Sequence, residues 1–236
     1  MGLTWTSMGP MAAAALAACL AVCLAALVGG WVMRRSSMGE RLLGTLAAFG
    51  IGFQVVHFAE HIIQFGYWVL HPDRKPYITP WATSAVDGFA FWCQTVPGAG
   101  GGAARGNEVL HFVGNSIFLA GLVGMYLLAG RRGVDASSFR SVRWALWVQG
   151  IHVVEHAVLT VTFFATGEAL GMSTMFGIFD PTDSFVPSYR VVWHFVLNLV
   201  ATAFGVWALR DLRRAGAIGG RRHVEPAVPV DLAPSV

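Results

Sequence analysis

The chain has 236 residues, of which 55% are hydrophobic and only 12% charged, with a formal net charge of +3. A mean hydropathy of +0.58 means more apolar surface than one water-soluble core can bury, so an integral membrane protein is expected. The arginines cluster at the ends of apolar runs, where membrane topology explains them, so nucleic-acid binding is not expected. Cys19, Cys23 and Cys93 lack paired spacing, which argues against a disulfide framework or a thiolate metal site.

Five apolar runs are long enough to cross about 30 Å of hydrocarbon as helices. They cover roughly residues 11–33, 42–70, 108–130, 142–166 and 190–210. The sequence therefore predicts an all-α integral membrane protein with five transmembrane helices. The first helix is expected to be peripheral. It is also expected to be retained, because it lacks the basic residues that precede the apolar run of a secretory signal. We expect one membrane domain over residues 1–222 and a disordered cytoplasmic tail over 223–236.

Basic residues indicate the orientation of these helices. Twelve of the sixteen lie in the segments after the first and third runs and in the tail, whereas residues 164–189 carry acids and no base. By the positive-inside rule, the N-terminus is predicted to lie outside and the C-terminus in the cytoplasm, and we expect a bacterial plasma membrane. Residues 72–107 and 164–189 then become external loops. Their aromatic residues are typical either of short interfacial helices over the bundle or of a headgroup belt.

A polar pattern occurs twice inside the apolar runs. Gln54-Val-Val-His57-Phe-Ala-Glu60-His61 matches Gln149-Gly-Ile-His152-Val-Val-Glu155-His156, and His111-Phe-Val-Gly-Asn115 matches His194-Phe-Val-Leu-Asn198. These matches are the residues that a membrane helix should avoid, so they indicate an internal duplication with a function. Repeat A covers about 42–130 and repeat B about 142–210. The two are predicted to form a pseudo-twofold four-helix bundle of parallel repeats, whose axis follows the membrane normal.

Helical spacing brings the polar residues of each run to one face, in the outer half of the bilayer. Six histidines and two glutamates are the candidate metal ligands: His57, His61, His111, His152, His156, His194, Glu60 and Glu155. Glu60 and Glu155 are also expected to bridge ions or to act as acids and bases, and Glu108 to tune a ligand or relay protons. Four amides are expected to orient the imidazoles around the cofactor: Gln54, Gln149, Asn115 and Asn198.

Histidine and glutamate together predict two metal ions in a non-haem centre, with iron favoured and copper or zinc possible. The leading hypothesis is a membrane oxidoreductase or oxygenase that acts on an apolar or lipid-like substrate from the outer leaflet. An electron donor and partner subunits are further candidates for binding. One alternative is a haem-binding electron-transfer subunit, since facing helices can supply two axial histidines. Another is a protein for metal transport, storage or delivery, although the inner halves of the helices carry few polar groups.

The string HxxEH is also found in inverted zinc metallopeptidases, where the two histidines bind zinc and the glutamate activates water. A peptidase needs one such helix and a third ligand. Two copies in symmetric membrane helices therefore argue against a peptidase.

Overall fold

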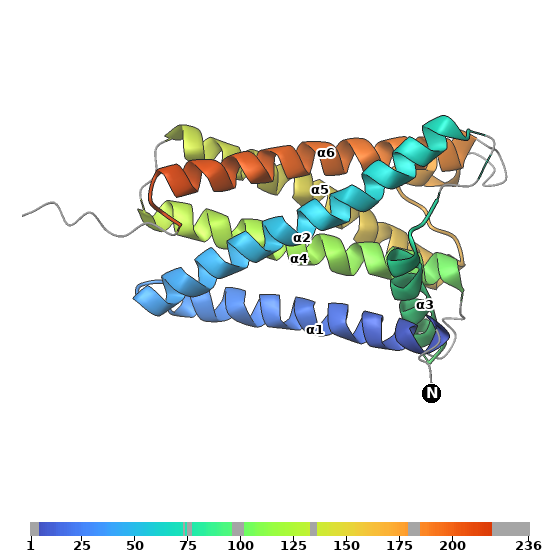
Figure 1. The fold of residues 1–236 in the computed structure, drawn as a ribbon, viewed down its shortest axis with the longest axis horizontal. Helices are drawn as coiled ribbons and strands as arrows, with labels where there is room; N and C mark the ends of the chain where they lie inside the picture. The colour runs from blue at the N-terminus through green and yellow to red at the C-terminus, as the bar shows by residue number, and fades with distance from the viewer. Residues whose placement is uncertain are drawn as a thin grey trace, which may run out of the picture.

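The computed structural model describes residues 5–72, 74, 77–95, 102–132, 136–178 and 185–218. This part of the chain forms helices and no strand (Figure 1). The elements in order are α1 (Trp5–Val32), α2 (Ser37–Leu70), α3 (Pro80–Gln94), α4 (Ala103–Arg132), α5 (Ala136–Thr166), the 3-10 helix η1 (Met172–Gly177) and α6 (Phe185–Arg214). The all-α prediction is confirmed. The predicted tail, 223–236, lies outside the described residues.

Within the described residues, α1, α2, α4, α5 and α6 are long and apolar enough to cross a membrane. Their number agrees with the five predicted spans and indicates a multi-pass membrane protein. The ends at residues 70 and 166 also agree with the prediction, but α2, α4 and α5 begin about five residues before their apolar runs. Polar residues can extend a helix beyond the hydrocarbon. At α2, for example, the Ser36 hydroxyl accepts a hydrogen bond from the Gly39 amide at 3.1 Å and caps the first turn.

Four of the long helices surround the region that contains the histidines. Helix α2 contacts α4 and α6, and α5 also contacts α4 and α6. Helix α1 lies along one side, against α2, α3 and α4, and the short α3 lies across the N-terminal end of α1 (Figure 1). Only 11% of the apolar window of α1 is buried, against 67% for α4. Of the five long helices, α4 is therefore the most buried and α1 the most exposed.

Small residues set the closest helix contacts. A Cβ atom on Gly50 of α2 would lie 2.8 Å from the Cα atom of Gly121 on α4, so the two backbones touch there. Likewise, a Cβ atom on Gly88 of α3 would lie 1.9 Å from the carbonyl oxygen of Gly9 on α1. These two contacts fix α2 and α3 against their neighbours on either side of the histidine region.

Apolar side chains fill the half of the bundle that contains the C-terminal end of α6. This cluster includes Ala47, Ile51, Phe118, Leu122, Met125, Ala208 and Leu212. Large apolar side chains also remain on the outside: Val55, Ile62 and Val154 are 48%, 50% and 61% exposed. Exposed valine and isoleucine on long helices are the surface that lipid would cover. Among the described residues, the buried polar side chains thus gather in the other half of the bundle, toward α3 and η1.

Candidate metal centre

The six predicted histidines come together in two groups of three. The first triad is His57 and His61 of α2 with His111 of α4, and the second triad is His152 and His156 of α5 with His194 of α6. In each triad, one ring nitrogen from every histidine lies within 4.8 Å of the other two. The spacing of four residues places two imidazoles on one helix face, and an adjacent helix supplies the third. Each triad therefore belongs to one sequence repeat.

The paired histidines have the same geometry in both triads. The Nε2 atoms of His57 and His61 are 3.2 Å apart, and those of His152 and His156 are also 3.2 Å apart. Two nitrogens that share an ion through bonds of about 2.1 Å would be about 3.0 Å apart at a right angle and about 3.4 Å at the tetrahedral angle. Both pairs therefore fit a shared cation.

The third histidine of each triad has a fixed tautomer. Nδ1 of His111 donates to the Asn107 carbonyl, and Nδ1 of His194 donates to the Arg190 carbonyl, each at 2.8 Å. Because a carbonyl oxygen can only accept, Nδ1 carries the proton and the Nε2 lone pair of a neutral ring is free. A histidine that binds a metal is commonly held in this way.

The two triads lie next to each other. The rings of His111 and His156 are stacked with centroids 5.1 Å apart, and those of His61 and His194 are stacked at 6.1 Å. Each of these contacts joins one triad to the other. Two ions held by the triads would therefore be neighbours in one centre.

Four buried amides join the repeats crosswise. The Gln54 amide donates to Oδ1 of Asn198 on α6, and the Gln149 amide donates to Oδ1 of Asn115 on α4, both at 2.9 Å. Each asparagine also donates to the carbonyl of the histidine four residues earlier, at 2.8 or 2.9 Å. All four side chains are 0% exposed. The amides thus hold the helices that carry the histidines, and these bonds go to backbone and amide oxygens rather than to the rings.

Glu60 and Glu155, which the sequence predicted as ligands, lie outside the two triads. Glu60 accepts hydrogen bonds from the hydroxyl of Thr79 at 2.6 Å and from its amide at 3.0 Å, at the start of α3. Glu155 accepts from the amides of Met172 and Ser173 at 3.0 and 2.7 Å, at the start of η1. Both carboxylates are nearly fully buried. The two glutamates therefore anchor the segment that follows each helix, in matching ways.

An ion pair between a buried carboxylate and a partly exposed guanidinium lies beside the second triad. Glu108 of α4 is 2% exposed and accepts a hydrogen bond from Arg190 of α6. Its other oxygen lies 3.9 Å from Nδ1 of His156, and among the described residues neither atom has a hydrogen-bond partner. The prediction that Glu108 acts near a ligand agrees with this placement. Arg190 was not singled out, although an arginine at the start of an apolar run is itself a signal of function.

Two cavities reach the histidines. The first, of about 210 Å³, lies among α1, α2, α3 and α4, is lined mostly by apolar side chains, and has His57 and His111 in its wall. The second, of about 190 Å³, is bordered by His61, His111, Arg190 and His194. All three members of the first triad therefore border a cavity. His152 and His156, by contrast, border neither of these two cavities and are 0% exposed.

Comparisons with known proteins identify the family but no activity. No curated protein and no solved structure matches the chain. A family model described as "Family of unknown function (DUF6008)" matches residues 2–225 and so spans all of the residues described above. The chain therefore belongs to the DUF6008 family.

Proposed function

We propose that this protein is a membrane metalloprotein whose six histidines hold two adjacent metal ions, one in each triad. The observation that carries the proposal is the pair of three-histidine groups, each with ring nitrogens within 4.8 Å of one another. The free Nε2 lone pairs of His111 and His194, set by their Nδ1 hydrogen bonds, support it. Imidazoles buried in an apolar bundle need hydrogen bonds or a cation, and a shared cation satisfies three at once.

The matching contacts of the two halves support the predicted pseudo-twofold arrangement. Each repeat supplies two histidines from one helix and one from the next, and each glutamine bonds to an asparagine of the other repeat. A dinuclear centre between parallel repeats is the simplest result of such a duplication. The arginine clusters at the opposite end of the bundle support an external position for the centre.

The donor set favours copper over the iron expected from the sequence. The case for iron rested on Glu60 and Glu155 as hard oxygen ligands, yet both carboxylates accept hydrogen bonds from Thr79, Met172 and Ser173. Six imidazoles without a carboxylate are a nitrogen-only set, which suits copper, zinc and iron and binds copper(II) most tightly among the divalent ions. Copper is therefore the first candidate and zinc the second.

Redox chemistry on an apolar molecule is the function that such a centre supports best. Three imidazoles per ion leave a coordination position for an external ligand. Two neighbouring copper ions held by the triads would supply a two-electron acceptor, so that a substrate could lose two electrons and two protons and dioxygen could become hydrogen peroxide. The apolar cavity that reaches His57 supports a substrate drawn from the membrane. We therefore propose an oxidoreductase that oxidises an apolar or lipid-like substrate with dioxygen.

A haem is less compatible with the packing. Neighbouring imidazoles of the six have ring centroids between 4.8 and 6.1 Å apart and touch one another directly. A porphyrin bound between two of them would have to separate the helices. Metal transport is also disfavoured. In the part of the chain that the structure describes, the apolar cluster that contains Phe118 and Met125 fills the half of the bundle beyond the histidines. A transport route needs polar groups through both halves.

Elemental analysis of the detergent-purified protein with its visible spectrum tests this proposal. Two copper ions per chain, no Soret band, and dioxygen consumption that needs an apolar reductant would support it. A Soret band would favour the haem subunit. Bound metal without dioxygen consumption would favour storage or delivery, and a chain that binds neither metal nor haem would overturn the metal centre. His71, exposed at the end of α2, provides the control, because His71→Ala should leave metal content unchanged.

A further inference from the structure

We infer that the two metal positions are not equivalent: the first triad holds the ion that meets substrate, at the end of a cavity that takes a small apolar molecule from the membrane. This inference rests on the proposed metal centre and adds which ion reacts and what class of ligand it receives. It depends on differences between halves that are otherwise closely matched.

The first difference is access to the histidines. His57 and His111 border the apolar cavity, whereas His61 and His111 border the second cavity. In the second triad, His152 and His156 are fully buried and line neither of these two cavities in the described part of the chain, whereas His194 borders the second one. Catalytic metal sites keep an open position, whereas structural sites are closed by the protein. The first triad, with all three members at a cavity wall, is therefore the more open of the two sites.

The second difference is the origin of the apolar cavity. Its outer wall consists of Ala12 and Leu16 of α1 and of Ala82, Ala85 and Val86 of α3. In repeat B, the segment between α5 and α6 contains the six-residue η1 instead of a helix like α3. Helices α1 and α3 therefore build the cavity on the side of the first triad alone.

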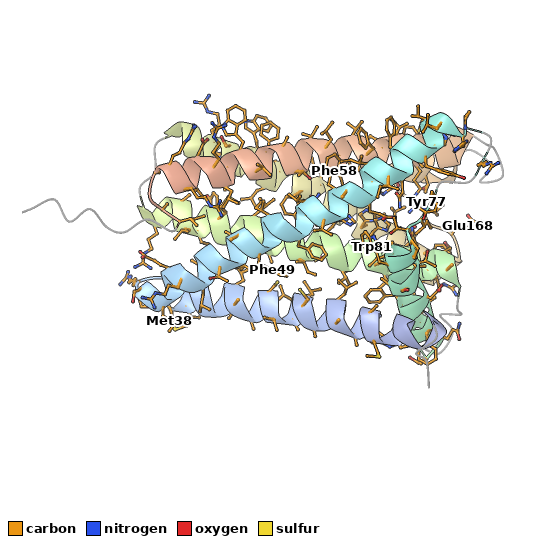
Figure 2. The ribbon with its side chains drawn as sticks, in the orientation of Figure 1. Met38, Phe49, Phe58, Tyr77, Trp81 and Glu168 are labelled. Carbon is orange, nitrogen blue, oxygen red and sulfur yellow. The ribbon has the colours of Figure 1, made fainter. Side chains whose placement is uncertain are left out.

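The cavity opens where lipid would lie. Val56 of α2 and Trp81 in the first turn of α3 both line it and are 61% and 51% exposed. Figure 2 shows Trp81 at the end of α3 nearest to α2. Glu60, also in the wall, accepts hydrogen bonds from Thr79 and Gln64, so its oxygens are already occupied. Apart from Glu60, Gln64 and Asn107, the wall is therefore apolar, and the imidazoles of His57 and His111 form part of it.

Its size limits the ligand. A volume of about 210 Å³ is below the range of about 300–1,000 Å³ that is usual for drug-sized ligands. The ligand is therefore a small apolar molecule, or one end of a longer apolar chain, whose polar or reactive end approaches the first triad.

Gly114 of α4 provides a way to fill this cavity without disturbing the fold. It lines the cavity, and a Cβ atom there would meet only the ring of Phe53, at an ordinary 3.6 Å. Gly114→Ala and Gly114→Val therefore narrow the cavity in two steps. Gly52 of α2 is the matched control, because it is exposed and a Cβ atom there meets nothing within 4 Å.

The experiment uses the full chain loaded with Co²⁺, whose visible spectrum reports its ligands, and the probes imidazole and 1-hexylimidazole. We expect one molecule of 1-hexylimidazole to bind per chain and to change the visible absorption of one of the two cobalt ions. Gly114→Val should weaken this probe at least about tenfold, the cost of losing a filled apolar contact. Gly114→Ala should have a smaller effect, and imidazole affinity should stay within about twofold. Gly52→Val should bind both probes like the parent protein.

Three results would overturn the inference. Two 1-hexylimidazole molecules per chain would make the metal positions equivalent. An unchanged affinity in Gly114→Val, with two cobalt ions still bound, would show that the cavity does not lead to the reactive ion. Absence of bound metal from the parent protein would overturn this inference together with the proposed function, whereas the first two results leave the metal centre intact.

Discussion

Nε2 of His61 lies 3.2 Å from Nε2 of His57, and the same distance separates the corresponding pair in the second repeat. Because an ion shared by such a pair needs both nitrogens, His57→Ala and His152→Ala should each remove one of the two metal ions. Metal content by elemental analysis, with His71→Ala as the control, measures this. An unchanged stoichiometry in both variants would contradict the ligand assignment.

Metal removal by a chelator should also lower the melting temperature of the parent protein.

Substitution of the two buried glutamates tests whether they bind metal or anchor the segments that follow their helices. Glu60→Gln should keep full metal content but lower stability by about 1–3 kcal/mol, because one neutral amide oxygen replaces two charged carboxylate oxygens as acceptor for Thr79 and Gln64. Glu155→Gln should behave alike through Met172 and Ser173. Hydrogen exchange should quicken at the amides of Thr79 and Ser173.

The control for these variants is Glu168→Gln, which changes an exposed acid, labelled in Figure 2. It should alter neither exchange nor metal content. Metal loss in Glu60→Gln or Glu155→Gln without faster exchange would instead support the carboxylates as ligands, as the sequence first indicated.

The pair Glu108 and Arg190 should show strong energetic coupling. Arg190→Gln leaves a buried carboxylate without its partner, and we expect a loss of about 3–5 kcal/mol. The double variant Glu108→Gln/Arg190→Gln should recover part of that loss, since no unpaired charge remains. Reversible unfolding in mixed micelles measures the cycle. Additive effects of the two substitutions would show that the ion pair does not form.

The crosswise amide bonds predict a specific pattern of coupling. Gln149→Ala should cost about 0.6 kcal/mol, the average for hydrogen bonds between membrane helices, and at most about 1.7 kcal/mol. It should be coupled to Asn115→Ala, its partner at 2.9 Å, and Gln54→Ala should be coupled to Asn198→Ala. Because these amides hold the helices that carry the ligands, metal affinity should fall by about tenfold.

Gln54→Ala combined with Asn115→Ala is the matched control, since these two residues belong to different bonded pairs. The effects of these two substitutions should add. Coupling between them as strong as within the bonded pairs would show that the amides act as one network and would contradict the pairing.

The sequence by itself determined the helical membrane architecture and the grouping of the histidines. Long apolar runs have few alternatives to helices in lipid, because every backbone group must be paired within the segment. The i, i+4 spacing of His57 and His61 then fixes a shared face by geometry alone. Repetition of the pattern at His152 and His156 identified the second triad, because one such pair could be chance and two are not.

Tertiary structure decided what lies around those histidines. Glu60 shares the helix face of its neighbours, but its partner is Thr79, nineteen residues away in a segment whose path no local pattern determines. Arg190 reaches Glu108 across a gap of 82 residues. The apolar cavity depends on where α1 and α3 pack, through the close approach of Gly9 and Gly88. Helix periodicity is a local property, whereas these contacts depend on how separate helices and loops meet. The packing of α1 and α3 on one repeat alone made the two halves of the bundle unequal.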